Sequence, residues 1–224
     1  VNDTLDTVIT PVSKAITHLE NLGNGVVGEH ITRQYKGAFA RLRDGFNDCF
    51  AAMRRMIADA NMLVDAAVHG RLDTRADASQ HKGDFRKIVE GVNQTLDSIV
   101  GNLEAIPTPI QFMDKDFNIQ YINKTGAALL GKSKQELTKY KCSDVWNTTK
   151  CRTKDCPCQK AMDNNIVHEC ENDLVMNGKG MDIHCASAPL KDADGNILGS
   201  FEFVTDQSDI KQAARTMAKI GEYQ

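Results

Sequence analysis

The 224-residue sequence predicts a mainly α-helical N-terminal half followed by an α+β domain with one antiparallel sheet. Three observations support this division: a helical apolar pattern recurs along residues 5–104, Pro107 and Pro109 interrupt it, and short strand-like runs separated by turn residues follow. Because a helix rarely continues through two closely spaced prolines, the fold is expected to change near Ile106.

The stretch 37–67 carries the clearest helical pattern. Its apolar positions, at alternating steps of three and four residues, are Phe39, Leu42, Phe46, Cys49, Met53, Met56, Ala60, Leu63 and Ala67. Such alternation is typical of a heptad seam, which keeps one edge of a helix against a partner helix. We predict a dimer seam along Phe39 to Leu63, although an ordinary amphipathic bundle helix has the same periodicity.

An internal repeat favours the seam. Three windows in the same register start at residues 1, 46 and 92, and residues 37–45 match residues 83–91 in the spacing of their glycine and apolar positions. A fixed period of this size indicates stacked supersecondary units. Each unit is expected to contain a helix, a polar connector, and a second helix that continues into the next unit.

The helices are expected over residues 5–22, 37–67 and 85–103. Pro11 is expected to loosen or start the first helix, and Gly23 to end it. The connectors, 23–36 and 71–82, are mostly polar. In the third helix, the two steps of four from Ile88 to Leu96 are a stutter, which changes the winding of a coiled coil.

These residues resemble tandem HAMP signalling modules, with Pro11 near the first helix start, a glycine after it, and sparse apolar residues in the connectors. The sequence departs from that family in lacking an acidic residue two positions before Gly37 and Gly83. The resemblance implies parallel homodimeric four-helix bundles that transmit a conformational bias, with modules at residues 1–54 and 55–103 that share a helix.

After residue 106 the sequence predicts a hairpin from the runs 110–113 and 119–122. Residues 123–130 form the next expected helix, ending at Gly131, and Ser133 is expected to cap a short helix. Three further strands are expected over residues 168–176, 181–190 and 197–205, joined by turns at 177–178 and 192–196. This order is an α+β pattern.

The element order and the closing hairpin around Gly195 and Phe201 resemble a PAS sensory domain over residues 104–207, followed by a signalling helix at 208–224. The resemblance implies a domain that holds a small molecule or cofactor between sheet and helices, or none. A combination of HAMP and PAS is found in bacterial methyl-accepting chemotaxis receptors.

Composition excludes some functions. A net charge of −3 and a pI near 6.1 give no basic patch for nucleic acid, and no apolar run is long enough to cross a bilayer. The chain starts at Val1 and ends within a helical pattern, so we expect a cytoplasmic segment of an inner-membrane receptor. A membrane would be contacted only through other parts of that receptor, and a downstream output domain is an expected partner.

Six of the seven cysteines lie in the second half. Four form a group, namely Cys142, Cys151, Cys156 and Cys158. Thiol redox chemistry, structural disulfides in a long loop, or a metal or iron–sulfur site each explain such a group. The spacing lacks paired C-x2-C hooks, which places redox or disulfide roles ahead of metal.

Nearby cations are expected to lower the pKa of these thiols, and they are Lys141, Lys150, Arg152 and Lys154. Cys170, Cys185, His184 and Trp146 are secondary candidates for a pocket. Trp146 is expected in the core. The histidines of this half lie in predicted strands, so haem and flavin are possible cofactors that the sequence does not favour. No nucleophile, phosphate loop or acid–base pair indicates an enzyme.

The sequence thus predicts the signal-input and relay segment of a chemoreceptor-like transducer, a homodimer that performs no catalysis. Met53 and Met56, together with small seam residues, are expected to leave two helix packings close in energy. One alternative is a regulatory segment of a sensor histidine kinase or cyclase. The other is a metal- or iron–sulfur-binding PAS protein on a dimerisation stalk.

Overall fold

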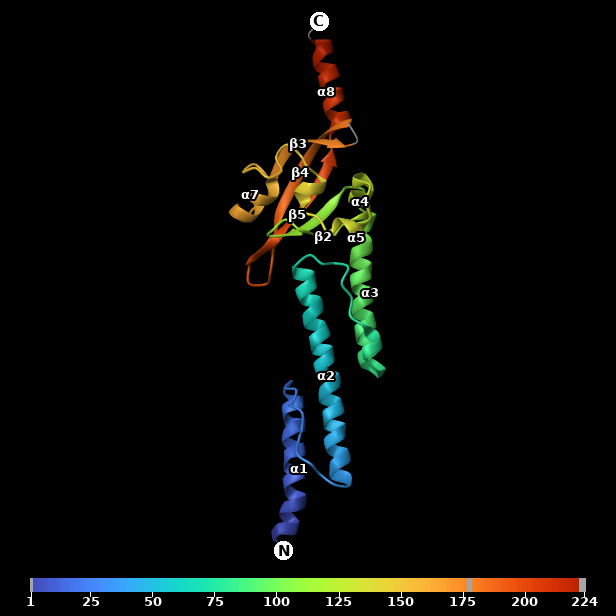
Figure 1. Cartoon of the computed structure of the whole chain (residues 1–224), viewed down its shortest axis with the longest axis vertical. Helices are drawn as coiled ribbons and strands as arrows, with labels where there is room; N and C mark the ends of the chain where they lie inside the picture. Colours follow the sequence, from blue (N-terminus) through green and yellow to red (C-terminus); the bar gives the residue numbers. More distant parts are fainter. Residues whose placement is uncertain (1, 177–178, 222–224) are drawn as a thin grey trace. The chain divides into compact units, whose positions relative to one another are not determined.

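The computed structural model describes residues 2–176 and 179–221 (Figure 1). The chain divides into two compact units. Unit 1 comprises residues 1–62 and 76–91, and unit 2 comprises residues 63–75 and 92–224. The predicted turn at Asn177-Gly178 lies outside the described residues.

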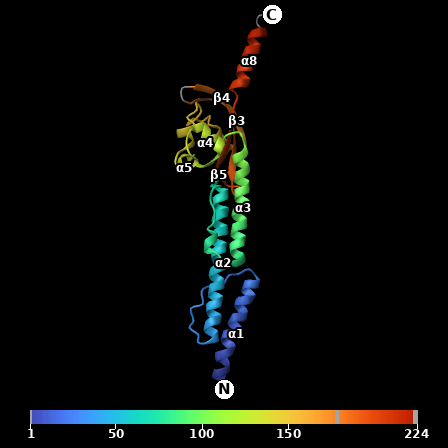
Figure 2. The same cartoon turned by 90° about the vertical axis from the view of Figure 1, so that its right-hand side faces the viewer.

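Unit 1 is helical, as the apolar periodicity predicts. Helix α1 spans Asn2–Gly23, α2 begins at Ala38 and ends at Val68, and α3 spans Gly83–Ala105. In both views α1 runs beside the first part of α2 (Figures 1 and 2). Of the two roles expected for Pro11, it does not start α1, which continues through it, although proline removes one backbone hydrogen bond from the helix.

Three rings join α1 to α2. The His18 ring lies 5.6 Å from the Phe46 ring and 5.5 Å from the Phe50 ring, measured between centroids. Phe50 is 1 % exposed, the least among the buried residues of unit 1, although it lies off the predicted seam. The seam therefore accounts for only part of the packing within one chain.

The first connector is held on α2 by two polar side chains. Asn47 accepts a hydrogen bond from the Ile31 backbone N–H at 2.8 Å and donates one to the Ile31 carbonyl. The Arg54 guanidinium donates to the Gly28 carbonyl at 2.6 Å. A Cβ at Gly28 would lie 2.8 Å from the Phe50 ring, so only glycine lets the connector pack this closely.

The second connector, 71–82, contains the short 3-10 helix η1 (Ala78–Gln80). The Asp77 carboxylate accepts a hydrogen bond from the Ser79 backbone N–H and caps η1. His81 is buried, and its Nε2 lies 2.6 Å from the Asp59 carboxylate of α2. Both connectors are non-helical over most of their length, as expected.

Unit 2 contains a five-stranded antiparallel sheet in the order β2-β1-β5-β4-β3. The strands are β1 Ile110–Asp114, β2 Ile119–Ile122, β3 His168–Met176, β4 Lys179–Lys191 and β5 Ile197–Asp206. Helix α4 (Lys124–Leu130) ends at Gly131, which has a φ of 66°, and Ser133 caps α5 (Lys134–Leu137). All of these elements agree with the sequence prediction.

Two helices were not expected between residues 138 and 167. Helix α6 spans Cys142–Val145 and α7 spans Pro157–Asn164, so the cysteine group does not lie on one long loop. Pro157 stands at the start of α7, where its missing N–H costs no hydrogen bond. Helix α7 packs on β3, β4 and β5 (Figure 1). The core beneath the helices includes Met113, Leu137, Leu174, Ile183 and Val204.

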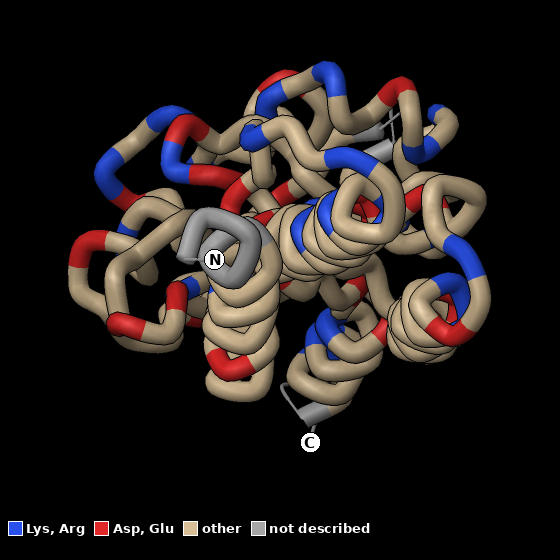
Figure 3. Tube along the Cα trace, turned by 90° about the horizontal axis from the view of Figure 1, so that it is seen from below, with Lys and Arg blue, Asp and Glu red and all other residues tan. Residues whose placement is uncertain are grey.

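Helix α8 (Ser208–Gly221) follows the sheet. Basic and acidic residues are interspersed along the trace (Figure 3). None of the described helices combines the length and apolar content of a membrane span.

Candidate functional site

The four grouped cysteines lie on short elements above the sheet. Cys142 is the first residue of α6, and Cys156 immediately precedes α7. Cys158 is the second residue of α7, and Cys151 lies in the turn segment between the two helices. All seven cysteines of the chain are free thiols in this structure.

These four cysteines and Cys185 of β4 line a cavity of about 20 Å³, which we call the thiol cavity. The other residues that line it are Trp146, Thr148, Pro157, Asn172, Ile183, Glu202 and Val204. This volume is enough for one water molecule. The structure therefore brings together all four members of the predicted group and two of the secondary candidates, Cys185 and Trp146.

A row of buried polar side chains from three adjacent strands lies beside the thiol cavity, and its middle member, Glu202, lines the cavity. Gln111 of β1 and Ser187 of β4 each pair in register with Glu202 of β5. The Gln111 amide donates to the Glu202 carboxylate at 2.8 Å, and the Ser187 hydroxyl donates to its other oxygen at 3.3 Å. Glu202 is 5 % exposed, so these bonds offset the cost of burying it.

The polar row contacts the thiols and the single tryptophan. The Gln111 amide nitrogen also donates to the Cys142 sulfur at 3.2 Å, and the Trp146 indole N–H donates to the Gln111 oxygen at 2.8 Å. The Cys158 sulfur lies 3.4 Å from the Ser187 hydroxyl.

The electrostatics of the thiol cavity differ from the sequence expectation. Burial raises the pKa of Glu202. Burial and the Glu202 charge raise the pKa of Cys185. For Cys142, the interaction with Cys158 lowers the pKa, but burial and the Glu202 charge outweigh it, so the pKa of Cys142 is raised overall. The pKa of Cys156 rises through its hydrogen bond with Cys158 and through burial.

The Cys158 pKa is raised by its hydrogen bond with Cys142, and that of Cys170 is raised by burial despite the opposing effect of Lys150. The prediction that nearby cations lower the pKa of the grouped thiols is therefore wrong for Cys142, Cys156 and Cys158. Their thiols are held protonated by burial.

A wider groove adjoins the thiol cavity. This outer groove has a volume of about 480 Å³, and Cys142, Cys151 and Cys156 line both it and the thiol cavity. Three basic residues also line it, namely Lys141, Arg152 and Lys154. Small molecules in the outer groove therefore meet the thiols directly.

The remaining secondary candidates lie elsewhere. Cys170 pairs in register with Cys185 and is half-buried, while the His184 Nε2 lies 3.6 Å from the exposed Glu169 carboxylate. The thiol cavity is too small for haem or flavin, and its lining includes no histidine. Among residues 2–176 and 179–221, no group of three or more His, Cys, Asp and Glu residues is arranged to hold a metal ion.

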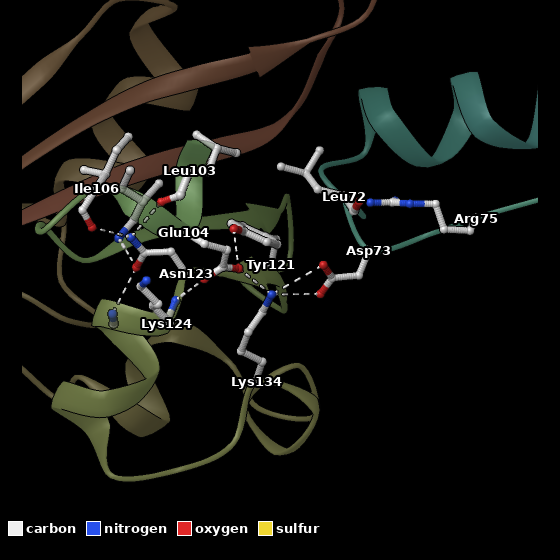
Figure 4. Close-up of polar contacts among 12 residues, drawn as sticks. Leu72, Asp73, Arg75, Leu103, Glu104, Ile106, Tyr121, Asn123, Lys124 and Lys134 are labelled. Carbon is white, nitrogen blue, oxygen red and sulfur yellow. Dashed lines mark hydrogen bonds and ion pairs between the residues drawn. The ribbon is translucent and has the colours of Figure 1, made fainter. Parts of the chain in front are cut away.

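A second polar cluster, which we call the α3 junction, fixes the end of α3 to the sheet domain (Figure 4). The Glu104 carboxylate accepts hydrogen bonds from the Tyr121 hydroxyl at 2.7 Å, the Lys134 ammonium at 2.6 Å and the Lys124 backbone N–H at 2.5 Å. Although burial acts to raise the pKa of Glu104, the bonds from Lys134 and Tyr121 lower it overall. Glu104 is therefore held as a carboxylate.

Asn123 forms the other half of the α3 junction. Its amide nitrogen donates to the carbonyls of Leu103 and Ile106 at 3.3 Å and of Thr108 at 2.9 Å. Its oxygen accepts from the backbone N–H groups of Ile110 and Gly126, each at 3.0 Å. One fully buried side chain thus ties the end of α3 to both β1 and α4.

Lys134 extends the α3 junction to the second connector. Its ammonium lies 3.3 Å from the Asp73 carboxylate and 4.6 Å from the centroid of the Tyr121 ring (Figure 4). Arg75 of the same connector pairs with Asp97 of α3 at 2.8 Å. Sequence reasoning identified Asn123 only at the start of a helix and missed Glu104, Lys134 and Asp73, because no local pattern marks contacts across about 30 residues or more.

The base of α8 is fixed in a similar way. Lys211 lies 2.9 Å from the Glu171 carboxylate of β3 and 3.3 Å from the Asp182 carboxylate of β4. The Gln207 N–H donates to the Asp182 carbonyl at 2.8 Å. Lys150, from the cysteine-bearing segment, donates to the Glu171 carbonyl at 2.6 Å. The segment between α6 and α7 is therefore linked to α8 through one residue of β3.

The predicted seam of α2 is only partly covered within one chain. Phe46 and Leu63 are buried, Leu42 and Ala60 are exposed, and the rest are half-buried, namely Phe39, Cys49, Met53 and Met56. Similar apolar positions on other helices are exposed, among them Val12, Ile99, Ile210 and Met217.

Two family models match the chain. The HAMP domain model matches residues 1–55 and 80–115, and the PAS fold model matches residues 103–212. No curated protein matches the chain.

Solved PAS structures are similar at low identity. A PAS domain from a two-component sensor histidine kinase is 11 % identical, with a TM-score of 0.43, and the match covers 51 % of this chain and 98 % of that one. A PAS domain from Colwellia psychrerythraea is 16 % identical, with a TM-score of 0.46 and the same coverage. A PAS domain of an HTR-like protein from Haloarcula marismortui is 14 % identical, with a TM-score of 0.45, covering 54 % and 98 %.

Proposed function

Since the chain consists of a HAMP region followed by a PAS domain, we propose that it is the sensory and relay segment of a bacterial chemoreceptor-like transducer. Its work is conformational. A change in helix packing passes along α3 to the PAS domain, the PAS domain adds an input of its own at the thiol cavity, and α8 carries the result onward.

The α3 junction is the observation that carries this proposal. Two side chains, Glu104 and Asn123, fix the last turn of α3 to the first strands and helix of the PAS domain. A rotation or shift of α3 therefore moves groups at the edge of the sheet rather than being absorbed by a flexible linker. Lys134 and Asp73 bring the preceding connector into the same cluster.

We propose that the active form is a parallel homodimer with two HAMP modules that share α2. The repeat period, the two connectors and the half-covered α2 seam support this arrangement. Exposed apolar residues at heptad positions on α8, Ile210 and Met217, fit the same face of a second copy. The segment lies in the cytoplasm in this proposal.

The relay is tested with Glu104→Gln and the control Glu90→Gln. Glu90 pairs only with Arg86 on the exposed surface of α3 in the described contacts, so it reports the effect of losing a carboxylate from this helix. We expect Glu104→Gln to speed amide hydrogen exchange in residues 97–106 and 121–126 by about tenfold, because a charge-assisted bond worth about 1.5–3 kcal/mol is lost.

The control should leave those segments unchanged. Equal exchange in both variants would contradict a mechanical link between α3 and the PAS domain. In the intact transducer, Glu104→Gln should also uncouple the signal received upstream of α3 from the output, whereas Glu90→Gln should not.

A further inference from the structure

We propose that Cys142 and Cys158 are a redox-active dithiol that small anionic disulfides oxidise through the outer groove, with Glu202 accepting the proton of Cys158. The dithiol chemistry stands on the geometry of the thiol cavity, and its role as a signal rests on the function proposed above.

The choice of Cys142 and Cys158 follows from their positions. Both thiols line the thiol cavity although they come from different helices, α6 and α7. Their sulfurs contact the same row of polar side chains, Cys142 through Gln111 at 3.2 Å and Cys158 through Ser187 at 3.4 Å. Cys156 also lines the thiol cavity, but it lies only two residues from Cys158, immediately before α7. Side chains at this spacing do not face each other on a helix, so a Cys156–Cys158 disulfide would unwind the first turn.

Access favours Cys142 as the thiol that reacts first. Cys142 lines both the outer groove and the thiol cavity, whereas Cys158 lines the thiol cavity without lining the groove. Attack by the Cys142 sulfur on a disulfide RS–SR forms a mixed disulfide Cys142–S–SR and releases RS⁻, which takes up the Cys142 proton. Cys158 then attacks the Cys142 sulfur, forms the intramolecular disulfide and releases the second RS⁻.

Glu202 accepts the proton that Cys158 loses. Glu202 and Cys158 both line the thiol cavity, and Ser187 links them: its hydroxyl lies 3.4 Å from the Cys158 sulfur and 3.3 Å from the Glu202 carboxylate. Glu202 is acceptor to the thiol as the sulfur attacks and then passes the proton to the leaving RS⁻. Overall, two protein thiols and RS–SR give one protein disulfide and two RSH, a two-electron exchange.

The charge of the outer groove selects the oxidant. Lys141, Arg152 and Lys154 line it, so a disulfide that bears carboxylates is attracted and an uncharged one is not. The structure thus favours an anionic disulfide over an uncharged one.

Formation of the disulfide would tie α6 to α7 across the segment that contains Lys150. Lys150 donates to the Glu171 carbonyl, and the Glu171 carboxylate pairs with Lys211 of α8. Oxidation is therefore positioned to change how α8 is held at its base.

The test uses the whole reduced chain and two oxidants in turn: glutathione disulfide and the uncharged hydroxyethyl disulfide. Thiols are counted and disulfides are mapped by mass spectrometry, while the fluorescence of Trp146, the single tryptophan, follows the thiol cavity in time. We expect glutathione disulfide to remove two thiols per chain and to link Cys142 to Cys158, about tenfold faster than hydroxyethyl disulfide.

Variants separate the steps. Cys158→Ser should stop at the mixed disulfide on Cys142, Cys142→Ser should give no product, and the control Cys170→Ser should react as the wild type. Glu202→Gln should accumulate the mixed disulfide and slow its resolution by about 100-fold. Lys154→Gln should remove part of the advantage of the anionic oxidant while leaving the reaction with hydroxyethyl disulfide unchanged.

A different mapped pair, or seven free thiols in folded protein after treatment, would overturn the proposal, as would equal rates with glutathione disulfide and hydroxyethyl disulfide. If the expected disulfide forms but amide exchange in α8 stays unchanged, the dithiol chemistry stands and the signalling role fails. The two proposals are therefore tested apart.

Discussion

The helices and the sheet domain differ in which side chains they expose and which they bury. On the helices, large apolar side chains are exposed: Val12 is 43 %, Ile99 is 51 % and Ile210 is 68 % exposed. In the sheet domain, polar side chains are buried: Gln111 and Asn123 are fully buried, and Glu202 is 5 % exposed. The first arrangement leaves apolar surface uncovered, and the second covers polar groups at a cost.

This difference indicates how each region responds. An exposed apolar stripe is stabilised only when another helix covers it, so the helices are sensitive to a partner and to small changes in packing. A buried polar network is stable only while each group keeps its partner and its charge, so the sheet domain is sensitive to chemistry at single atoms. The α3 junction connects these two kinds of response.

The largest effect is expected from Asn123→Ala, which removes five hydrogen bonds of a buried side chain at once. The backbone groups it leaves unpaired should destabilise the PAS domain by about 4 kcal/mol. Urea unfolding followed by Trp146 fluorescence measures this. The control Asn164→Ala removes an exposed amide whose contacts, with the Lys160 carbonyl and the His168 ring, are both four residues away in the sequence, and it should cost about 0.5 kcal/mol or less.

Similar urea midpoints for Asn123→Ala and Asn164→Ala would contradict the view that buried polar groups hold the α3 junction. In that case, apolar packing around Ile110 and Ile122 would have to hold the end of α3 in their place.

Much of the fold was predictable from local sequence signals. The helices, the hairpin and the cap at Ser133 follow from apolar periodicity and from side chains that bond their own neighbours. Such signals lie within a few residues of each other and act the same way in any context. The same signals placed the five strands.

What could not be predicted depends on contacts distant in sequence. Helix α6 has four residues and α7 has eight, too short for periodicity to identify. Glu104 and Lys134 meet only because the sheet domain has folded between them. The thiol pKa shifts were predicted in the wrong direction because charge counts along the sequence cannot report burial, which here outweighs the cations.

The second prediction concerns the disulfide. A disulfide that closes a loop of about 15 residues lowers the entropy of the unfolded chain and stabilises the folded state by about 3 kcal/mol. A disulfide between Cys142 and Cys158 closes a loop of similar length, so the oxidised PAS domain should be more stable than the reduced one by roughly that amount. Urea midpoints of the reduced and oxidised chain measure the gain. A lower midpoint on oxidation would mean that the thiol cavity must distort to bring the two sulfurs together.

The third prediction concerns the helices. Leu42→Ala should weaken the proposed homodimer about tenfold, because it removes apolar surface that a second copy would cover, which is worth about 1.4 kcal/mol or more. Phe50→Ala, by contrast, should destabilise each chain, since Phe50 is already buried by His18 and Phe46. Sedimentation over a range of concentrations separates the two effects, and a monomeric wild type would exclude the proposed dimer.

The smallest effect is the pH dependence contributed by Glu202. Burial raises its pKa in the folded protein above the ordinary value of 4.5, so the folded state binds a proton that the unfolded state has lost. The wild type should therefore lose stability relative to Glu202→Gln as pH rises from about 4.5 through the folded pKa, with a slope of at most about 1.4 kcal/mol per pH unit. Below pH 4.5 the difference should be constant, because Glu202 is protonated in both states.

Glu104 of the α3 junction has the opposite sign, since its folded pKa is lowered. Its contribution is present above the ordinary carboxyl pKa and is lost as pH falls through the folded pKa. Parallel unfolding series of wild type, Glu202→Gln and Glu104→Gln between pH 3 and 8 compare the two directly. If the stability of the wild type relative to each variant changes with pH in opposite directions, the α3 junction needs its carboxylate charge whereas the thiol cavity holds one at a cost. Equal changes with pH for the two variants would refute that contrast.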